Sequence, residues 1–131
     1  MSRFEFEAKC VAVECLDGET QLVGFADQKF DTQTYLMLQR AFEHDAQDVE
    51  QGMDTFHVEW CSEDLSGYGG IARFVLKADG ADVTFDLEAA DALGMQQLSI
   101  NFHLTAPERD ALREGLANIF RDSNCLVVDD A

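Results

Sequence analysis

The sequence has few basic residues for its length. Its 131 residues include 9 Lys and Arg against 26 Asp and Glu, so the formal net charge is −17 at pH 7. A surface this acidic repels phosphate backbones and anionic lipid headgroups, and we therefore expect no direct binding to nucleic acid or to a membrane. The same charge attracts basic proteins and speeds encounter with them. Acidity that serves only solubility is the other interpretation.

Cysteine motifs, a leader sequence and long apolar runs are also missing. The four cysteines, at positions 10, 15, 61 and 125, form no CxxC pair, and this spacing favours reduced thiols in a cytosolic compartment. No basic segment followed by an apolar run opens the sequence, so we expect no signal peptide. No apolar stretch reaches the roughly 18 residues that a membrane-spanning helix needs. The expected location is the cytoplasm.

The common motifs of catalytic and cofactor sites are absent as well. The sequence has no GxSxG nucleophile elbow, no GxxxxGK[ST] phosphate loop and no dinucleotide fingerprint after a strand. His44, His57 and His103 lack the HxH or HxxxH spacing of a zinc site, and the last two occupy polar positions of predicted strands. We therefore predict a protein without enzymatic activity, metal or cofactor.

Alternating apolar and polar residues predict strands along most of the chain. They are expected at 4–15 with a bulge near Lys9, and at 20–26, 34–39, 56–60, 71–78, 81–87 and 98–104. The strand at 34–39 is nearly apolar on both faces. Asp17-Gly18 and Asp79-Gly80 are typical of tight hairpin turns. The apolar tail at 125–128 is a candidate for a last edge strand.

The C-terminal part predicts one amphipathic helix, from about 106 to about 121. Thr105 to Glu108 is a capping box, and Pro107 stands in the first turn, where proline is tolerated. A shorter helical turn at 88–93 is closed by Gly94. The predicted fold is a single α+β domain over 1–131, a mostly antiparallel, twisted sheet of about seven or eight strands with the C-terminal helix packed on it.

Acidic residues are concentrated on both sides of the strand at 56–60. One block spans 43–54 and contains no Lys or Arg, and a second spans 59–64. The glycines in Ser66 to Gly70 are typical of a turn that lets Tyr68 pack or reach a partner. Carboxylates around aromatic residues suit a protein-binding surface, although Trp60 is expected in the core. The candidate partner-binding residues are Asp45, Asp48, Glu50, Asp54, Glu63, Asp64 and Tyr68.

Two other classes of protein remain open at this point. The first is a small-ligand or metal-binding domain, or an enzyme, that uses the acidic loop 43–54 and the glycine turn 67–70. The carboxylate spacing does not match the calcium-binding EF-hand loop, and the glycines lead into a strand, whereas phosphate cradles open a helix. The second is an assembly subunit whose exposed apolar strands form a homodimer.

Three segments resemble one known family. Residues 48–59 (DVEQGMDTFHVE), 66–71 (SGYGGI) and 4–8 (FEFEA) are similar to the bacterial immunity protein 10 family of polymorphic toxin systems. The GMDTFHVE and GYGG stretches are the most specific, and the resemblance runs along most of the chain. It implies a cytoplasmic antitoxin without enzymatic activity that binds and neutralises a cognate toxin. The charge of −17 independently favours a basic toxin, such as a nuclease.

Overall fold

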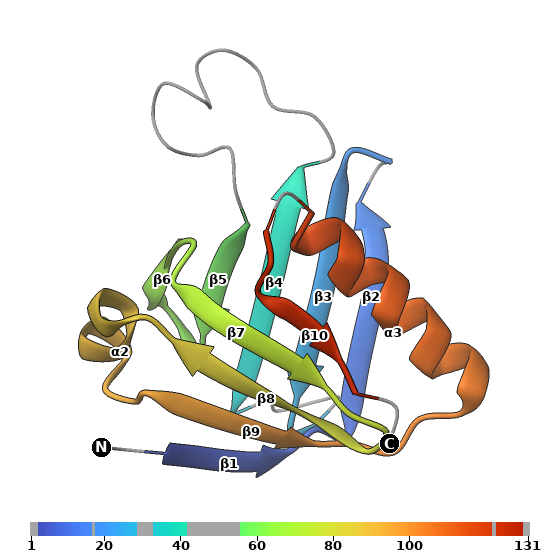
Figure 1. Ribbon diagram of the computed structural model, residues 1–131, viewed down its shortest axis with the longest axis horizontal. Coiled ribbons are helices and arrows are strands. Elements are labelled where there is room, and N and C mark those ends of the chain that lie inside the picture. Colours follow the sequence, from blue (N-terminus) through green and yellow to red (C-terminus); the bar gives the residue numbers. More distant parts are fainter. Residues whose placement is uncertain (1–2, 17, 29–32, 42–55, 122, 130–131) are drawn as a thin grey trace.

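The computed structural model describes residues 3–16, 18–28, 33–41, 56–121 and 123–129, without the side chains of residues 63 and 64 (Figure 1). Ten strands and two helices lie within these ranges. The predicted α+β class and the predominance of antiparallel pairing are confirmed. Among the same residues, no helix is long and apolar enough to cross a membrane.

Sheet A has five strands, of which the two at its edges pair in parallel with their neighbours. The order across the sheet is β1 (Arg3–Glu7), β9 (Gln97–Asn101), β8 (Gly80–Phe85), β7 (Ile71–Leu76) and β10 (Leu126–Val128). The hairpin at Asp79-Gly80 joins β7 to β8, as predicted. The apolar tail forms β10, which confirms the expected edge strand.

Sheet B also has five strands, and all of its neighbours are antiparallel. The order is β2 (Cys10–Leu16), β3 (Thr20–Ala26), β4 (Tyr35–Ala41), β5 (His57–Trp60) and β6 (Ser62–Tyr68). Each strand therefore pairs with the next one along the chain. The first two are joined around the predicted turn at 17–18, of which residue 17 lies outside the described residues.

The chain changes sheets twice, between β1 and β2 and again between β6 and β7. Residues 4–15 were expected as one strand with a bulge, but β1 and β2 are separate strands that flank Ala8 and Lys9 and belong to different sheets. The glycine-rich segment also contains β6, which alternation did not indicate. These two differences account for most of the excess of ten strands over the expected seven or eight.

The core lies between the inner face of sheet B and a second layer made of sheet A and α3 (Ala106–Ile119) (Figure 1). Phe25 of β3 is fully buried; its ring centroid lies 5.8 Å from that of Phe102 and 6.2 Å from that of Phe74. Trp60 packs against Phe6 at 5.8 Å, so its expected burial is confirmed. Aromatic contacts thus connect the two layers along the length of the core.

Helix α3 is capped by neighbouring residues at its start and by a residue of a distant strand at its end. The predicted capping box is present, because Thr105 and Glu108 bond each other's backbone N–H groups. At the other end, buried Arg40 of β4 donates to the carbonyl oxygens of Ile119 at 3.2 Å and Arg121 at 2.6 Å. This cation satisfies carbonyls that the helix leaves without an internal partner, so it joins the helix to sheet B.

Gly115 lets α3 approach sheet B closely, since a Cβ there would lie 2.8 Å from Cγ1 of Val13. The second helix, α2 (Leu87–Leu93), follows β8 directly. Asp86 caps its first turn by accepting from the N–H of Ala89, and Gly94 ends it in the left-handed conformation at a φ of 76°. The short helix predicted at 88–93 is confirmed.

Candidate functional site

The outward side of sheet B is one candidate surface, here called the open face. Sheet A and α3 pack on the opposite side, and none of the described helices or strands packs on this one (Figure 1). Strand alternation and register place sixteen described residues on it. They are Cys10, Ala12, Glu14, Leu16, Thr20, Leu22, Gly24, Ala26, Tyr35, Met37, Gln39, Ala41, His57, Glu59, Ser66 and Tyr68.

The open face is nearly uncharged. Its described positions carry two carboxylates, Glu14 and Glu59, and no Lys or Arg. The Glu59 carboxylate accepts a hydrogen bond from the hydroxyl of Tyr35, which keeps that carboxylate against the sheet. Around the middle of the face, Gly24 pairs with Ala12 on one side and with Met37 on the other. Ala12 and Gly24 therefore add little side-chain bulk beside Met37.

The outward side of sheet A has the opposite character. Its charged residues are Arg3, Glu5, Glu7, Arg73, Lys77 and Asp82, several of which are paired. Arg3 donates to the hydroxyl oxygen of Ser99 at 2.7 Å, and the Ser99 hydroxyl donates to Asp82 at 2.8 Å. Lys77 forms an ion pair with the same carboxylate. This is an ordinary solvated face with local charge pairing.

Asp82 is held in its charged form by this network. Burial raises the pKa of its carboxyl, but hydrogen bonds from Lys77 and Ser99 and the nearby positive charges outweigh that effect, so the pKa lies below its ordinary value. The same contact raises the pKa of Lys77. Both groups therefore favour the ion pair in the folded protein.

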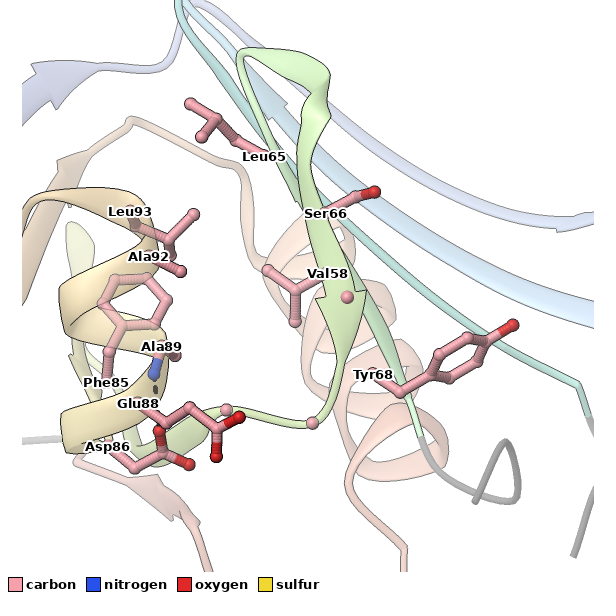
Figure 2. Close-up of a pocket in the computed structure, with 13 residues that line it drawn as sticks. Val58, Leu65, Ser66, Tyr68, Phe85, Asp86, Glu88, Ala89, Ala92 and Leu93 are labelled. Carbon is pink, nitrogen blue, oxygen red and sulfur yellow. Dashed lines mark hydrogen bonds between the residues drawn. The ribbon is translucent and has the colours of Figure 1, made fainter. Parts of the chain in front are cut away.

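A groove of about 350 Å³ runs between β6 and α2 (Figure 2). Its walls are mainly apolar, with Val58 and Leu65 on one side and Phe85 and Leu93 on the other. Glu88 lies near one end, beside the glycine turn (Figure 2). The groove is therefore an apolar channel with a carboxylate at its border.

The glycines beside this groove have a structural reason. Gly69 and Gly70 have φ values of 72° and 94°, in the region that favours glycine, and they carry the chain from sheet B to sheet A. A Cβ at Gly70 would lie 2.8 Å from Cβ of Ala89. The N–H of Gly69 already donates to the carbonyl oxygen of Phe56, so it is not free to bind a phosphate. These contacts support the interpretation of the segment as a turn.

Tyr68 is the predicted partner-binding residue whose side chain the structure places. It ends β6, is 48% exposed, and its ring packs edge-on against His57 with centroids 5.1 Å apart. The side chain points away from the groove and belongs to the open face (Figure 2). Asp45, Asp48, Glu50 and Asp54 lie outside the described residues. Glu63 and Asp64 lie on β6, but their side chains are likewise outside the description.

The acidic loop 43–54, which was a candidate for metal binding, lies outside the described residues. Within those ranges, no group of three or more His, Cys, Asp or Glu side chains could hold a metal ion.

The open face was not identified from the sequence. A signal for it exists, because the outward-facing residues of β2, β3 and β4 are mostly small or apolar instead of charged. The strand at 34–39, apolar on both faces, is part of that signal. Register was needed to show that these positions form one surface.

Comparison with protein families places the chain among immunity proteins. The model of the Immunity protein 10 family matches residues 7–111, which is more than half of the chain, and the chain belongs to this family. The resemblance carried by residues 48–59 and 66–71 is thereby confirmed. Comparison with curated proteins and with solved structures gives no match. Membership of the family supports an immunity role.

Proposed function

We propose that this chain is a non-enzymatic immunity protein that binds and neutralises a cognate, basic toxin domain in the bacterial cytoplasm. The observation that carries the proposal is the family match over residues 7–111. The net charge of −17 supports a basic partner, because complementary charge accelerates association and excludes acidic competitors. Neutralisation of this kind requires a long-lived complex and no chemical step by the immunity protein.

The acidic residues act in this proposal mainly as steering groups. Exposed charges at the border of an interface raise the association rate more than they slow dissociation, and salt screens them. We propose Asp45, Asp48, Glu50, Asp54, Glu63 and Asp64 for this role, and Tyr68 as a packed contact. Aromatic side chains near the centre of an interface commonly contribute more binding free energy than the surrounding charges.

Co-expression with a basic toxin domain, sought first among the neighbouring genes, tests the function. Neutralisation predicts that cells expressing both proteins grow, and that the two proteins elute as one complex from a size-exclusion column. Failure to restore growth, together with separate elution, would contradict the proposal.

The steering role has its own test. Replacement of Asp45, Asp48, Glu50 and Asp54 by Lys should slow association with the toxin domain and reduce the dependence of its rate on salt. A control with the same change in net charge replaces Glu5, Glu7, Asp91 and Glu114, which are exposed and lie on sheet A and the helices. Equal effects from both variants would indicate that only net charge matters.

Small-ligand binding is a second candidate function, favoured by the groove between β6 and α2. Its volume of about 350 Å³ is near the lower end of the roughly 300–1,000 Å³ typical of ligand pockets. The apolar walls favour an apolar ligand. Titration with the apolar dye Nile red should then give a fluorescence rise that Ala92→Phe in the groove abolishes and Ala72→Phe on β7 does not. Absence of the rise in the unmodified protein would exclude this candidate.

A further inference from the structure

The open face has the composition of a protein interface. Its sixteen described positions include two carboxylates and no Lys or Arg, in a chain with 27% charged residues. Interface centres are depleted in charge and enriched in Tyr and Met, and the face contributes Tyr35, Met37 and Tyr68. Antiparallel sheets that face water normally carry polar residues there, as the outward side of sheet A does.

The size of the open face also suits an interface. Four of its strands have seven residues, which corresponds to about 23 Å at the usual rise of about 3.3 Å per residue. Five strands at a spacing of about 4.8 Å span roughly 20 Å. The face therefore covers roughly 450 Å², more than half of the about 800 Å² that one partner contributes to a standard interface.

Gly24 is the most informative residue on this face. A Cβ at this position would meet Cβ of Ala12 and Cδ2 of Leu22 at 4.0 Å, which is ordinary van der Waals contact. Its backbone is not among the glycines with positive φ. Nothing described within the chain therefore requires glycine here, although glycine weakens a strand by about 0.5–1 kcal/mol relative to alanine. Glycine in a strand interior often marks a bulge, a tight bend or close approach by a ligand or another backbone, and the register of β3 with both neighbours shows no bulge at Gly24.

The charge of the face selects the kind of partner. A second copy would bring Glu14 and Glu59 against the same face, whose described residues include no Lys or Arg to pair them, and both copies carry a net charge of −17. Like charges across an interface are destabilising. These carboxylates would instead pair with Lys or Arg of a different partner. Such a partner would have an apolar centre and basic residues around it.

We propose that the toxin docks on the open face of sheet B, through a flat apolar patch bordered by Lys or Arg. This inference rests on the proposed function and adds where the complex forms and what the toxin surface is like. Tyr68 is the residue that this surface shares with the interface predicted from the sequence. Gly24 marks the centre of contact.

The test compares two glycines on opposite sides of sheet B. Gly24→Lys places a long cation at the centre of the open face, where a side chain has room. Gly67→Lys is the matched control, because Gly67 lies on β6, lines the groove on the other side, and has no atom within 4 Å of its Cβ position. Both proteins are titrated against the toxin domain that the unmodified protein neutralises in the co-expression test, and their thermal unfolding is measured.

We expect Gly24→Lys to weaken the affinity by about 100-fold or more, as loss of a central contact does, and Gly67→Lys to retain it. Both should unfold at or slightly above the temperature of the unmodified protein, because each replaces a strand glycine without a clash. If Gly24→Lys does not fold, Met37→Lys on the neighbouring strand replaces it, with the same expected loss.

Three results would overturn the inference. Unchanged affinity of a folded Gly24→Lys protein removes the open face as the docking site. Loss caused by Gly67→Lys alone places the toxin at the groove. An unmodified protein that is a dimer in light scattering, and that Gly24→Lys converts to a monomer, shows that a second copy occupies the face. In all three cases growth rescue by the unmodified protein still supports the proposed function, whereas failure of rescue and binding by that protein contradicts both.

Discussion

Sheets A and B both pack one face into the core and turn the other face outward, and their outward faces differ in charge. On sheet A, Arg3, Ser99 and Asp82 form a hydrogen-bonded chain that ends at the ion pair with Lys77. On sheet B the corresponding positions are largely small or apolar, with Gly24 and Met37 side by side. Folding alone accounts for the first pattern, because polar residues face water. Folding alone does not explain the second pattern, which is typical of a surface that another protein covers.

The largest effect should come from the buried side of β3. Phe25→Ala should lower the free energy of unfolding by about 3–5 kcal/mol, because it removes a fully buried ring that contacts Phe74 and Phe102. Leu22→Ala, on the open face of the same strand, should cost about 1 kcal/mol. Urea denaturation measures both. Equal losses would mean that the open face is as important to folding as the core.

The next effect concerns binding. Leu22→Lys gives the open face a charge like those on sheet A, and should weaken toxin binding by about tenfold while costing no more stability than Leu22→Ala. Thr84→Lys adds the same side chain to the outward face of sheet A, where Thr84 pairs with Arg73 and Gln97. Calorimetric titration of the toxin domain compares them, and a loss limited to Thr84→Lys would reverse the assignment of the two faces.

A smaller change in stability distinguishes a glycine that the fold requires from the glycine on the open face. Gly24→Ala should raise the free energy of unfolding by about 0.5–1 kcal/mol, since the strand gains order without a clash. Gly80→Ala on sheet A should lower it, because the added Cβ would lie 2.5 Å from the carbonyl oxygen of Ile100. Urea midpoints test the pair. Destabilisation by Gly24→Ala would show that folding itself needs this glycine.

The smallest effect is a pH dependence that comes from the Asp82 network on sheet A. The pKa of Asp82 is lowered from its ordinary value of 3.8 in the folded protein. Its contribution is therefore complete above the unfolded pKa and is lost as the pH falls through the lower folded pKa. Asp82→Asn should reduce the loss of stability in acid, measured by urea midpoints at several pH values. An unchanged acid profile in Asp82→Asn would argue against the network.

Local elements were predictable because their signals are local. The capping box at Thr105 and Glu108, the glycine end of α2 at Gly94 and the turn at Asp79-Gly80 each involve residues within one turn of each other. The burial of Trp60 followed from strand alternation. The division into two sheets could not be predicted from alternation, because alternation indicates which side chains face inward but not which strands pair.

The candidate site was predictable only in part for the same reason. Tyr68 was identified from the glycines around it, and the structure places it on an exposed surface. The sequence did not predict that Ala12, Gly24 and Met37 lie side by side, because these residues come from three strands. The acidic residues at 45–54, which the sequence emphasised, lie outside the described residues and remain a prediction.

The sequence by itself determined the charge, the α+β class, the C-terminal helix and, through its motifs, the family. Composition and short-range periodicity are sufficient for these, because each depends on residues close together in the chain. Tertiary structure decided that residues 4–15 serve two sheets, that Arg40 satisfies carbonyls at the end of α3, and that the described residues of one outward face carry few charges. Those features depend on pairing between strands that are distant in the sequence. Burial of the core that the two sheets share determines which strands pair.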